Sequence, residues 1–319
     1  MAKDLVIGID VGGTSTKFGI VDARGAVLAQ SVLQSADYKD VKPYIADLAA
    51  ALFQLVADAG AEGRVRGIGV GAPNANYYTG SIENAVNLSW CGAGNIPFAK
   101  LLSEALDGLP VSLTNDANAA AVGEMTYGAA RGMKNFIMIT LGTGVGSGIV
   151  IDGKVVYGHD GFAGELGHTT AVRHNGRQCN CGRQGCLETY CSATGVARTA
   201  REWLEATDEP SLLRGLGEIT SKDVFSAAKE GDALARRVFE FTGRILGQML
   251  ADFIAFSAPE AIVLFGGLAR AKEFLTQPVA QAMNASVLSL WRGKVKLVYS
   301  QLKESDAAIL GASALAWEL

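Results

Sequence analysis

Three cysteines and one histidine form a ligand set suited to a soft metal ion. Cys179, Cys181 and Cys186 have C-x-C-x4-C spacing, and His168 precedes the first of them by eleven residues. Thiolates and an imidazole held this close favour zinc, and one histidine with three cysteines completes a closed tetrahedral site. A disulfide with spare thiols is the alternative, but a Cys-x-Cys pair closes a strained ring poorly. The pattern therefore predicts structural zinc at these four residues.

Carboxylates flank this predicted metal site. Glu165 stands three residues before His168, and Glu188 stands two residues after Cys186. A carboxylate accepts hydrogen bonds from two neighbouring hydroxyls, which suits a polyol. A zinc-bound histidine can also donate from its second ring nitrogen, so His168 is a candidate link between metal and substrate. For Glu188, a solvated helix start is an equally good interpretation.

Asn115 and Asp116 follow an expected strand and precede an alanine-rich helix. Asn and Asp are preferred N-cap residues, so helix capping is the simpler interpretation on spacing alone. Phosphoryl transfer, however, needs a group that accepts the proton of the attacking hydroxyl, and a carboxylate serves. Both interpretations hold if Asn115 caps the helix and Asp116 faces a substrate. Asn87, in a loop with Trp90, either contacts sugar hydroxyls or belongs to an ordinary turn.

Two glycine–threonine turns occur at corresponding places, Gly12-Gly13-Thr14 and Gly142-Thr143-Gly144. Glycine lets backbone N–H groups approach an anion without a Cβ in the way, and threonine adds a hydroxyl donor. A single glycine-rich hairpin is usually only a hairpin, but two related ones favour contacts to one polyphosphate. Neither turn matches a P-loop, and no dinucleotide fingerprint follows the first strand.

Two further positions are candidates for binding a nucleotide. Asp10, at the end of the first strand, is predicted to hold magnesium or its waters, or else to cap its own turn. Gly266-Gly267 follows a buried strand and either lets the backbone approach a nucleotide base or forms only a tight turn.

The elements that carry these residues repeat along the chain. Gly13-Thr14 aligns with Gly142-Thr143, and Gly19 with Gly148, at one offset of 129 residues (142 − 13 and 148 − 19). Such a repeat indicates a duplicated α/β domain, and we expect a cleft between its two lobes. Residues 76–87 are expected to form a loop. Strands are expected at 5–9, 17–21, 26–30, 66–71, 110–114, 136–141, 149–151, 154–157, 259–265 and 294–299, and helices at 41–60, 96–106, 117–127, 194–206, 220–230, 232–256 and 306–317.

Composition excludes several classes of protein. The 319 residues carry a formal charge of −4 without a basic block, which argues against a nucleic-acid partner. No charge-free apolar run reaches the roughly 20 residues of a membrane helix, and no signal peptide is expected. Five cysteines, three of them clustered, favour a metal site in a reducing, cytoplasmic setting over a secreted disulfide framework.

The chain closely resembles the ROK family of bacterial sugar kinases and repressors, within the actin-like ATPase superfamily. The resemblance runs from Leu5 to about Trp317. It is carried by these motifs: Asp10-Val11-Gly12-Gly13-Thr14, Asn87-Leu88-Ser89-Trp90, Asn115-Asp116-Ala117-Asn118, Leu141-Gly142-Thr143-Gly144, Glu165-Leu166-Gly167-His168 and the run from Cys179 to Glu188.

The resemblance implies a two-lobed actin-like ATPase fold, built from a duplicated ribonuclease-H-like α/β domain. The N-terminal lobe is expected at residues 1–116, completed by a C-terminal helix at about 305–319, and the second lobe with the zinc site at 117–304. It implies Asp116 as general base, both glycine turns on the ATP phosphates and Gly266-Gly267 near the adenosine. The sugar contacts it implies are Asn87, Asn115, Glu165, His168 and Glu188. Magnesium, structural zinc and a homodimer are also expected.

The expected reaction is transfer of the γ-phosphoryl group of ATP to the 6-hydroxyl of a hexose, with glucose as the first choice. N-acetylglucosamine, N-acetylmannosamine, allose and fructose remain alternatives. Two non-enzymatic alternatives are a sugar-sensing repressor and an inactive sugar-binding protein. The first strand begins at Leu5, which leaves no room for a preceding helix-turn-helix, and Asp116 with both turns argues for an active enzyme. Asn74 replaces the last glycine of the family's G-x-P-G loop, but Asn tolerates a positive φ.

Overall fold

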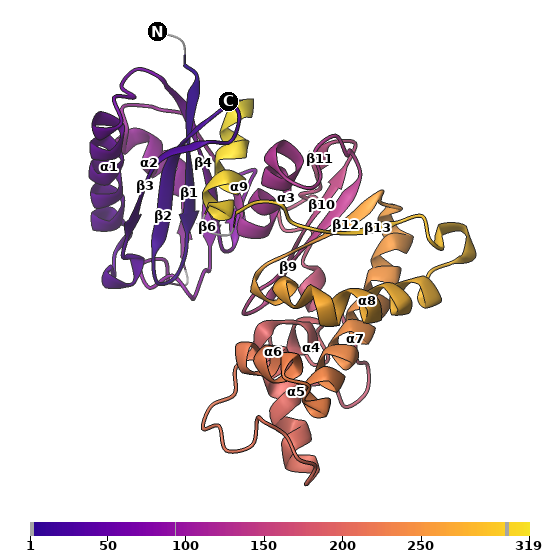
Figure 1. Cartoon of the computed structure of the whole chain (residues 1–319). Coiled ribbons are helices and arrows are strands. Elements are labelled where there is room, and N and C mark those ends of the chain that lie inside the picture. Colours follow the sequence, from indigo (N-terminus) through magenta and orange to yellow (C-terminus); the bar gives the residue numbers. More distant parts are fainter. Residues whose placement is uncertain (1–2, 93, 304–305) are drawn as a thin grey trace. The chain divides into compact units, whose positions relative to one another are not determined.

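A computed structural model describes residues 3–92, 94–303 and 306–319. The chain divides into two compact units (Figure 1). The first unit contains Met1–Met133, Gly148–Gly164 and Gln301–Leu319, and the second contains Lys134–Ser147 and Glu165–Ser300. Residue 305, where the expected C-terminal segment begins, lies outside the described residues. Within the described part of the chain, no helix is both long enough and apolar enough to span a bilayer.

The first unit is built on a five-stranded mixed sheet with the order β3-β2-β1-β4-β8. Strands β1 to β3 are antiparallel, whereas β4 and β8 run parallel to β1. Side chains alternate between the two faces along β1, and both faces are buried. The strands are β1 (Leu5–Val11), β2 (Thr16–Asp22), β3 (Val27–Leu33), β4 (Val65–Ala72) and β8 (Val111–Asn115).

Helices pack on both faces of this sheet. On one face, α1 (Val41–Asp58) and α2 (Phe98–Ala105) form a core with Leu5, Ile7 and Ile9 of β1. On the other face, α9 (Ala307–Leu315) packs against Val6 and Val21. Figure 1 shows α9 in yellow beside β1 and β4. The last helix of the chain therefore packs on the first unit.

Glycines explain how α9 comes so close to the sheet. A Cβ at Gly8 would lie 2.0 Å from the Ile309 carbonyl oxygen, and one at Gly69 would lie 1.8 Å from that of Ala312. A Cβ at Gly123 of α3 (Asp116–Tyr127) would lie 2.6 Å from Gly311 Cα. Any larger residue at these positions would force the backbones apart, so these glycines have a packing role.

The second sheet has the order β11-β10-β9-β12-β13, which repeats the topology of the first. This repeat confirms the duplication read from the 129-residue offset. The helices of the second unit enclose its largest core, which centres on the long helix α7. The strands are β9 (Phe136–Leu141), β10 (Val145–Ile151), β11 (Lys154–Val155), β12 (Ala261–Phe265) and β13 (Lys296–Tyr299), and the helices are α4 (Glu188–Cys191), α5 (Ala193–Ala206), α6 (Ser221–Lys229), α7 (Ala233–Ser257) and α8 (Lys272–Ser286).

The structure corrects three local expectations. Residues 76–87 are not entirely loop, because β5 (Ala75–Asn76) and β6 (Ser81–Glu83) pair with β7 (Asn95–Ile96) in a three-stranded sheet. Strands this short show no periodicity in sequence. Strand β10 begins at Val145 rather than at Ile149, so it also contains Gly146 and Gly148. Helix α8 is not among the expected helices, because the sequence indicated only a helix start after Gly266-Gly267.

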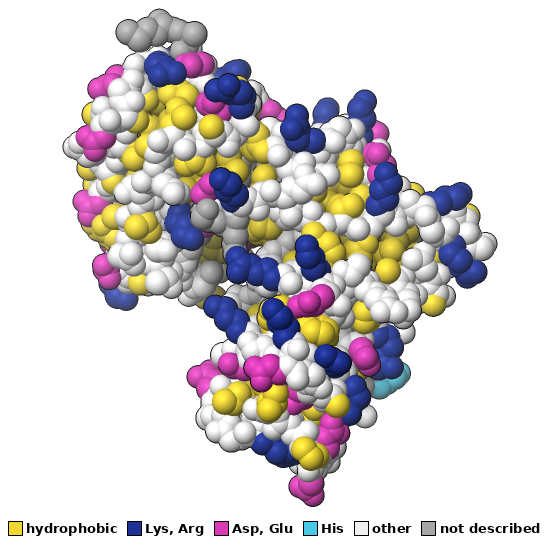
Figure 2. Space-filling model, viewed as in Figure 1, with side chains coloured by type: hydrophobic (Ala, Val, Ile, Leu, Met, Phe, Trp, Pro, Cys, Tyr) yellow, Lys and Arg dark blue, Asp and Glu magenta, His cyan; other side chains and the backbone are white. Residues whose placement is uncertain are grey.

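The surface carries charges of both signs. Figure 2 shows Lys and Arg side chains lying among Asp and Glu over much of the visible face.

Candidate active site and metal centre

The C-terminal edge of the first sheet brings two carboxylates together. Asp10 pairs with Gly71 across β1 and β4, and Gly71 pairs with Thr114 across β4 and β8. Asp116 begins α3 directly after β8. Parallel strands end at one edge, so Asp10 and Asp116 lie close enough for their charges to repel, and this repulsion contributes to a raised Asp10 pKa.

Asn115 and Asp116 both accept a hydrogen bond from the amide of Ala117, the second residue of α3. The Ala117 N–H donates to Asn115 Oδ1 at 2.9 Å and to Asp116 Oδ1 at 2.8 Å. Asn115 therefore caps the helix, as its residue type predicts. Asp116 is exposed to solvent, yet desolvation by the surrounding protein raises its pKa, against the lowering effect of the Ala117 hydrogen bond. A carboxylate with a raised pKa is a better proton acceptor than an ordinary one.

Asp10 is half-buried, and its charge is poorly compensated. Desolvation and repulsion from Asp116 raise its pKa to about 6, while Lys17 on β2 acts in the opposite direction. Two carboxylates at one edge with a single nearby lysine fit a divalent cation with oxygen ligands, such as magnesium.

Replacing the Asp10 carboxylate should stabilise the fold at neutral pH. Its pKa is raised on folding from 3.8, so the folded state binds more protons and loses stability as pH rises from about 4 to about 6. Asp10→Asn is expected to increase the free energy of unfolding by about 2–3 kcal/mol at about pH 8, and by about a third of that at about pH 4.5. Urea denaturation in magnesium-free buffer measures both values. An equal gain at the two pH values would contradict the assignment.

The first glycine turn orients its amides in one direction. Within the turn, the Gly12 N–H donates to the Ser15 carbonyl at 3.1 Å. Ser35 Oγ donates to the Gly12 carbonyl at 2.6 Å, and the Ala36 N–H donates to the Thr14 carbonyl at 3.2 Å. In a trans peptide the carbonyl and the following N–H point in opposite directions. The N–H groups of Gly13 and Ser15 follow these two carbonyls. They therefore point away from Ser35 and Ala36, as an anion site requires.

Gly13 also has a packing role. A Cβ at this position would lie 2.6 Å from the Asn87 carbonyl oxygen. The turn and the Asn87 loop are thus in direct contact, and the Asn87 side chain is exposed. Glycine at position 13 serves this close approach whether or not it contacts a phosphate.

Asn74 hydrogen-bonds the residues that precede the Asn87 loop. Its φ of 52° is left-handed, as its residue type allows. Its Nδ2 donates to the Glu83 carbonyl at 3.0 Å and to the Asn84 carbonyl at 3.2 Å. The side chain therefore provides two hydrogen bonds that glycine could not make.

In the second glycine turn, in the second unit, two carbonyls likewise accept hydrogen bonds from a neighbouring element. The Ala193 N–H donates to the Gly142 carbonyl at 2.8 Å, and Thr194 Oγ1 donates to the Thr143 carbonyl at 2.8 Å. The amides of Thr143 and Gly144 therefore point away from the start of α5. Gly266, with a φ of 100°, packs beside this turn, since a Cβ there would lie 2.6 Å from the Leu141 carbonyl oxygen.

The four predicted metal ligands lie together in the second unit. Their ligand atoms, one each from His168, Cys179, Cys181 and Cys186, are all within 4.8 Å of one another. Cys181 Sγ lies 3.6 Å from Cys186 Sγ, and His168 Nδ1 lies 3.7 Å from Cys179 Sγ. A zinc tetrahedron with bonds of about 2.3 Å has edges of about 3.8 Å, so the cluster fits this ion. In the structure all three thiols are free, with no disulfide among them.

Glu188 lies between the metal ligands and the second glycine turn. Its Oε2 accepts from the Val145 N–H at 2.9 Å, and its Oε1 lies 3.9 Å from Cys179 Sγ. A Cβ on Gly144 would lie 2.3 Å from Oε2, so this carboxylate occupies the space that a side chain at 144 would need. Glu188 is half-buried at the first position of α4 and is not a solvated helix start.

Glu165 and His168 flank the short turn before the metal-binding loop. The His168 N–H donates to the Glu165 carbonyl at 3.1 Å, and the Glu165 side chain is exposed. Because His168 Nδ1 faces Cys179, Nε2 is the nitrogen left for a second partner.

Within each unit the predicted residues gather in one region. In the first unit these are Asp10, Gly13, Asn87, Asn115 and Asp116; in the second, the turn at 142–144, Gly266, Glu188 and the metal ligands. Sequence reasoning missed Ser35 and Thr194, which hold the two turns through ordinary hydroxyl hydrogen bonds that have no sequence signature.

The chain is similar to known proteins along nearly its whole length. The model of the ROK family matches residues 6–318. A glucokinase of Halalkalibacterium halodurans is 39% identical over 90% of this chain and 88% of its own length. A Salmonella heidelberg N-acetylmannosamine kinase is 31% identical over 97% of each chain. A solved structure titled as a ROK family glucokinase from Streptomyces griseus, in complex with glucose and AMPPNP, is 32% identical, covers 99% of this chain and 100% of its own, and superposes with a TM-score of 0.79.

Proposed function

Starting from the fact that this chain belongs to the ROK family, we propose that it is an ATP-dependent kinase that phosphorylates glucose at its 6-hydroxyl. The observation that carries the proposal is the likeness along nearly the whole chain to glucokinases, one of them solved with glucose and an ATP analogue. The fold is that of an actin-like ATPase.

Asp116 is the general base in this proposal. Its carboxylate accepts the proton of the 6-hydroxyl as that oxygen bonds to the γ-phosphorus and the bond from phosphorus to the ADP oxygen breaks. The raised pKa supports the role because it brings the carboxyl closer to the pH at which the enzyme works. Asn115 holds the start of α3, so the carboxylate keeps a defined direction.

The two glycine turns bind the ATP phosphates in this proposal. The N–H groups of Gly13, Ser15, Thr143 and Gly144 point away from the elements that hold the turns, so they are directed as anion donors. Magnesium, with Asp10 as its protein contact, would offset charge on the phosphates. Gly266-Gly267, beside the second turn, is proposed to approach the adenosine.

Asn87, Asn115, Glu165, His168 and Glu188 are proposed to bind the sugar. Their amide, carboxylate and imidazole groups provide both donors and acceptors for neighbouring hydroxyls. We further propose a structural zinc ion on His168, Cys179, Cys181 and Cys186. Free thiols at this site suit a reducing, cytoplasmic location, and a homodimer is the expected assembly.

A coupled assay of ADP release over a panel of sugars tests the function. Glucose should have the highest kcat/KM, with glucose 6-phosphate as the product. N-acetylmannosamine is the second candidate because of the likeness to its kinase. If N-acetylmannosamine or another sugar has a higher kcat/KM than glucose, that sugar is the substrate and glucose is not. If no sugar leads to ADP release, the proposal that the protein is a kinase is wrong.

Asn74 offers a test of the loop that carries Asn87. Asn74→Gly keeps the left-handed backbone but removes two hydrogen bonds, so we expect the KM for glucose to rise several-fold with kcat nearly unchanged. Asn74→Ala adds a left-handed strain of about 1–2 kcal/mol and should also lower stability. Steady-state kinetics and thermal melts separate the two effects. A fall in kcat without a change in KM would show that the loop does not act through substrate binding.

A further inference from the structure

Arg177 is a buried cation whose hydrogen-bonding capacity is fully used. Its side chain is 8% exposed, and its guanidinium stacks on the Tyr190 ring at 4.6 Å. Nε and Nη2 donate to Glu202 Oε2 at 3.1 and 2.5 Å, and Nη2 also donates to Thr199 Oγ1 at 2.9 Å. Nη1 donates to the Thr189 and Gly195 carbonyls at 2.8 and 3.3 Å. These bonds use all five donors of the side chain.

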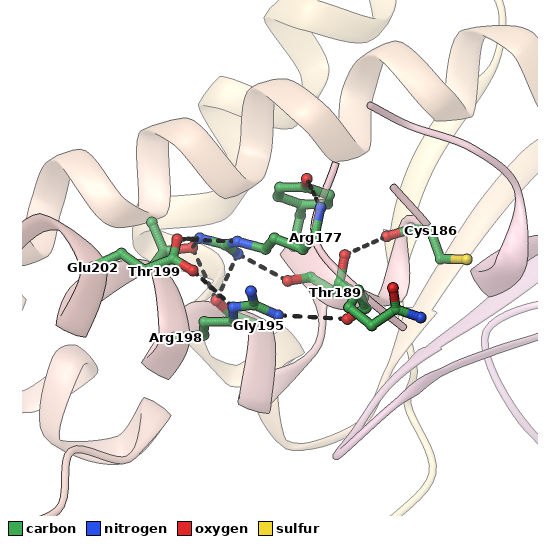
Figure 3. A network of polar contacts seen from close by, with 9 residues as sticks. Arg177, Cys186, Thr189, Gly195, Arg198, Thr199 and Glu202 are labelled. Carbon is green, nitrogen blue, oxygen red and sulfur yellow. Dashed lines mark hydrogen bonds and ion pairs between the residues drawn. The ribbon is translucent and has the colours of Figure 1, made fainter. Parts of the chain in front are cut away.

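These partners come from the end of the metal-binding loop and from helix α5. Figure 3 shows the guanidinium directed at Glu202, Thr199 and Gly195 of α5, with Thr189 on its other side. Arg177 itself stands two residues before Cys179, and Thr189 stands three residues after Cys186. One side chain therefore holds both ends of the loop that carries the three cysteines.

The same contacts continue to the second glycine turn. Helix α5, which Arg177 holds, hydrogen-bonds the carbonyls of Gly142 and Thr143 through its first residues. Glu188, the neighbour of Thr189, accepts from the Val145 N–H that follows the turn. Helix α5 is thus linked by hydrogen bonds to the metal-binding loop and to the second glycine turn, and Glu188 lies between these two segments.

We propose that Arg177 is the positioning residue that closes the metal-binding loop on α5, and thereby sets the directions of the Cys179 thiol and the Glu188 carboxylate. The inference rests on the zinc site proposed above. Arg177 touches neither the ligand atoms nor the glycine turn, so it acts through the residues it holds. Removing such an outer partner of a metal site costs about 10- to 100-fold in metal affinity.

Zinc release measures this role without relying on activity. Purified wild type, Arg177→Met and Arg177→Lys are each loaded with zinc, and its transfer to a chromophoric chelator is followed. Arg177→Met should release zinc about 10- to 100-fold faster than wild type. Arg177→Lys has three donors in place of five, so its zinc-release rate should lie between those of wild type and Arg177→Met. This variant keeps the inference testable if Arg177→Met does not fold.

Arg198→Met is the matched control. Arg198 pairs with the other oxygen of the same Glu202 carboxylate at 2.7 Å, but its side chain is 39% exposed. It contacts only the start of the loop, through one long hydrogen bond of 3.5 Å to the Gln178 carbonyl, and does not bond to Thr189 at the other end. Its release rate should stay near that of wild type. A folded Arg177→Met or Arg177→Lys that also releases zinc at the wild-type rate would overturn the inference, because a merely stabilising residue would lower the melting temperature alone.

The same samples separate this inference from the larger proposals. If the wild-type protein binds no zinc, both the proposed zinc site and the inference about Arg177 are wrong. The ADP-release assay on the same protein still tests the kinase proposal independently. In folded Arg177→Met saturated with zinc, the displaced Glu188 should raise the KM for glucose more than it lowers kcat. Equal KM values would contradict the link to Glu188.

Discussion

Asp116→Asn is expected to lower kcat by about 10²- to 10⁴-fold, the range that a positioned general base contributes. The amide keeps the size of the side chain but cannot accept the hydroxyl proton. Sugar affinity should stay close to that of wild type, because Asn115 still caps α3 and the Asn87 loop is untouched. Rapid-quench kinetics with ATP and glucose would give the rate of the chemical step, and calorimetry would give the sugar affinity.

A pH profile refines this result. In wild type, kcat should fall on the acidic side as the Asp116 carboxyl becomes protonated, at a pH above the ordinary range of an aspartate because its pKa is raised. The residual activity of Asp116→Asn should lack this acidic limb. Asp58→Asn is a suitable control, because Asp58 ends α1 and bonds to Gln54 on the same helix. Turnover by Asp116→Asn at the wild-type rate would remove Asp116 as the base.

Cys181→Ser is expected to lose zinc and to unfold at a lower temperature. Zinc bound by four protein ligands contributes directly to folding, and losing several kcal/mol lowers the melting temperature of a domain this size by about 10 °C or more. Activity should fall as well, because Glu188 lies 3.9 Å from Cys179 and follows the same loop. Elemental analysis should find about one zinc per wild-type chain and little in the variant.

Cys91→Ala provides the control for thiol removal. Cys91 is buried in the first unit and stands apart from the metal ligands, so the variant should lose a little packing energy and no zinc. Chelation of wild type should reproduce the Cys181→Ser phenotype. A metal-free wild-type preparation with full activity and an unchanged melting temperature would contradict a structural role for zinc.

The sequence alone was sufficient for features that depend on neighbouring residues. The metal ligands fall within nineteen positions, from 168 to 186, so their spacing nearly defines the cluster. Strand β9 was predicted at its observed bounds because it is a buried apolar run that ends at a glycine. The cap at Asn115 and the left-handed Asn74 follow from residue type. The repeated turn revealed the duplication because both copies keep their glycines.

The tertiary structure alone decided what depends on residues far apart in the chain. The repulsion between Asp10 and Asp116 arises because β1 and β8 end at one edge of a sheet, with β4 between them. Gly8 and Gly69 are required by a helix that begins some 240 residues or more later in the chain. In sequence, Arg177 looks like one more surface arginine. In the structure it is buried and makes five hydrogen bonds to four acceptor atoms of α5 and the end of the metal-binding loop. Local propensity sets capping, turns and clustered ligands, whereas burial and long-range pairing determine which charges meet, and these emerge only when the chain is folded.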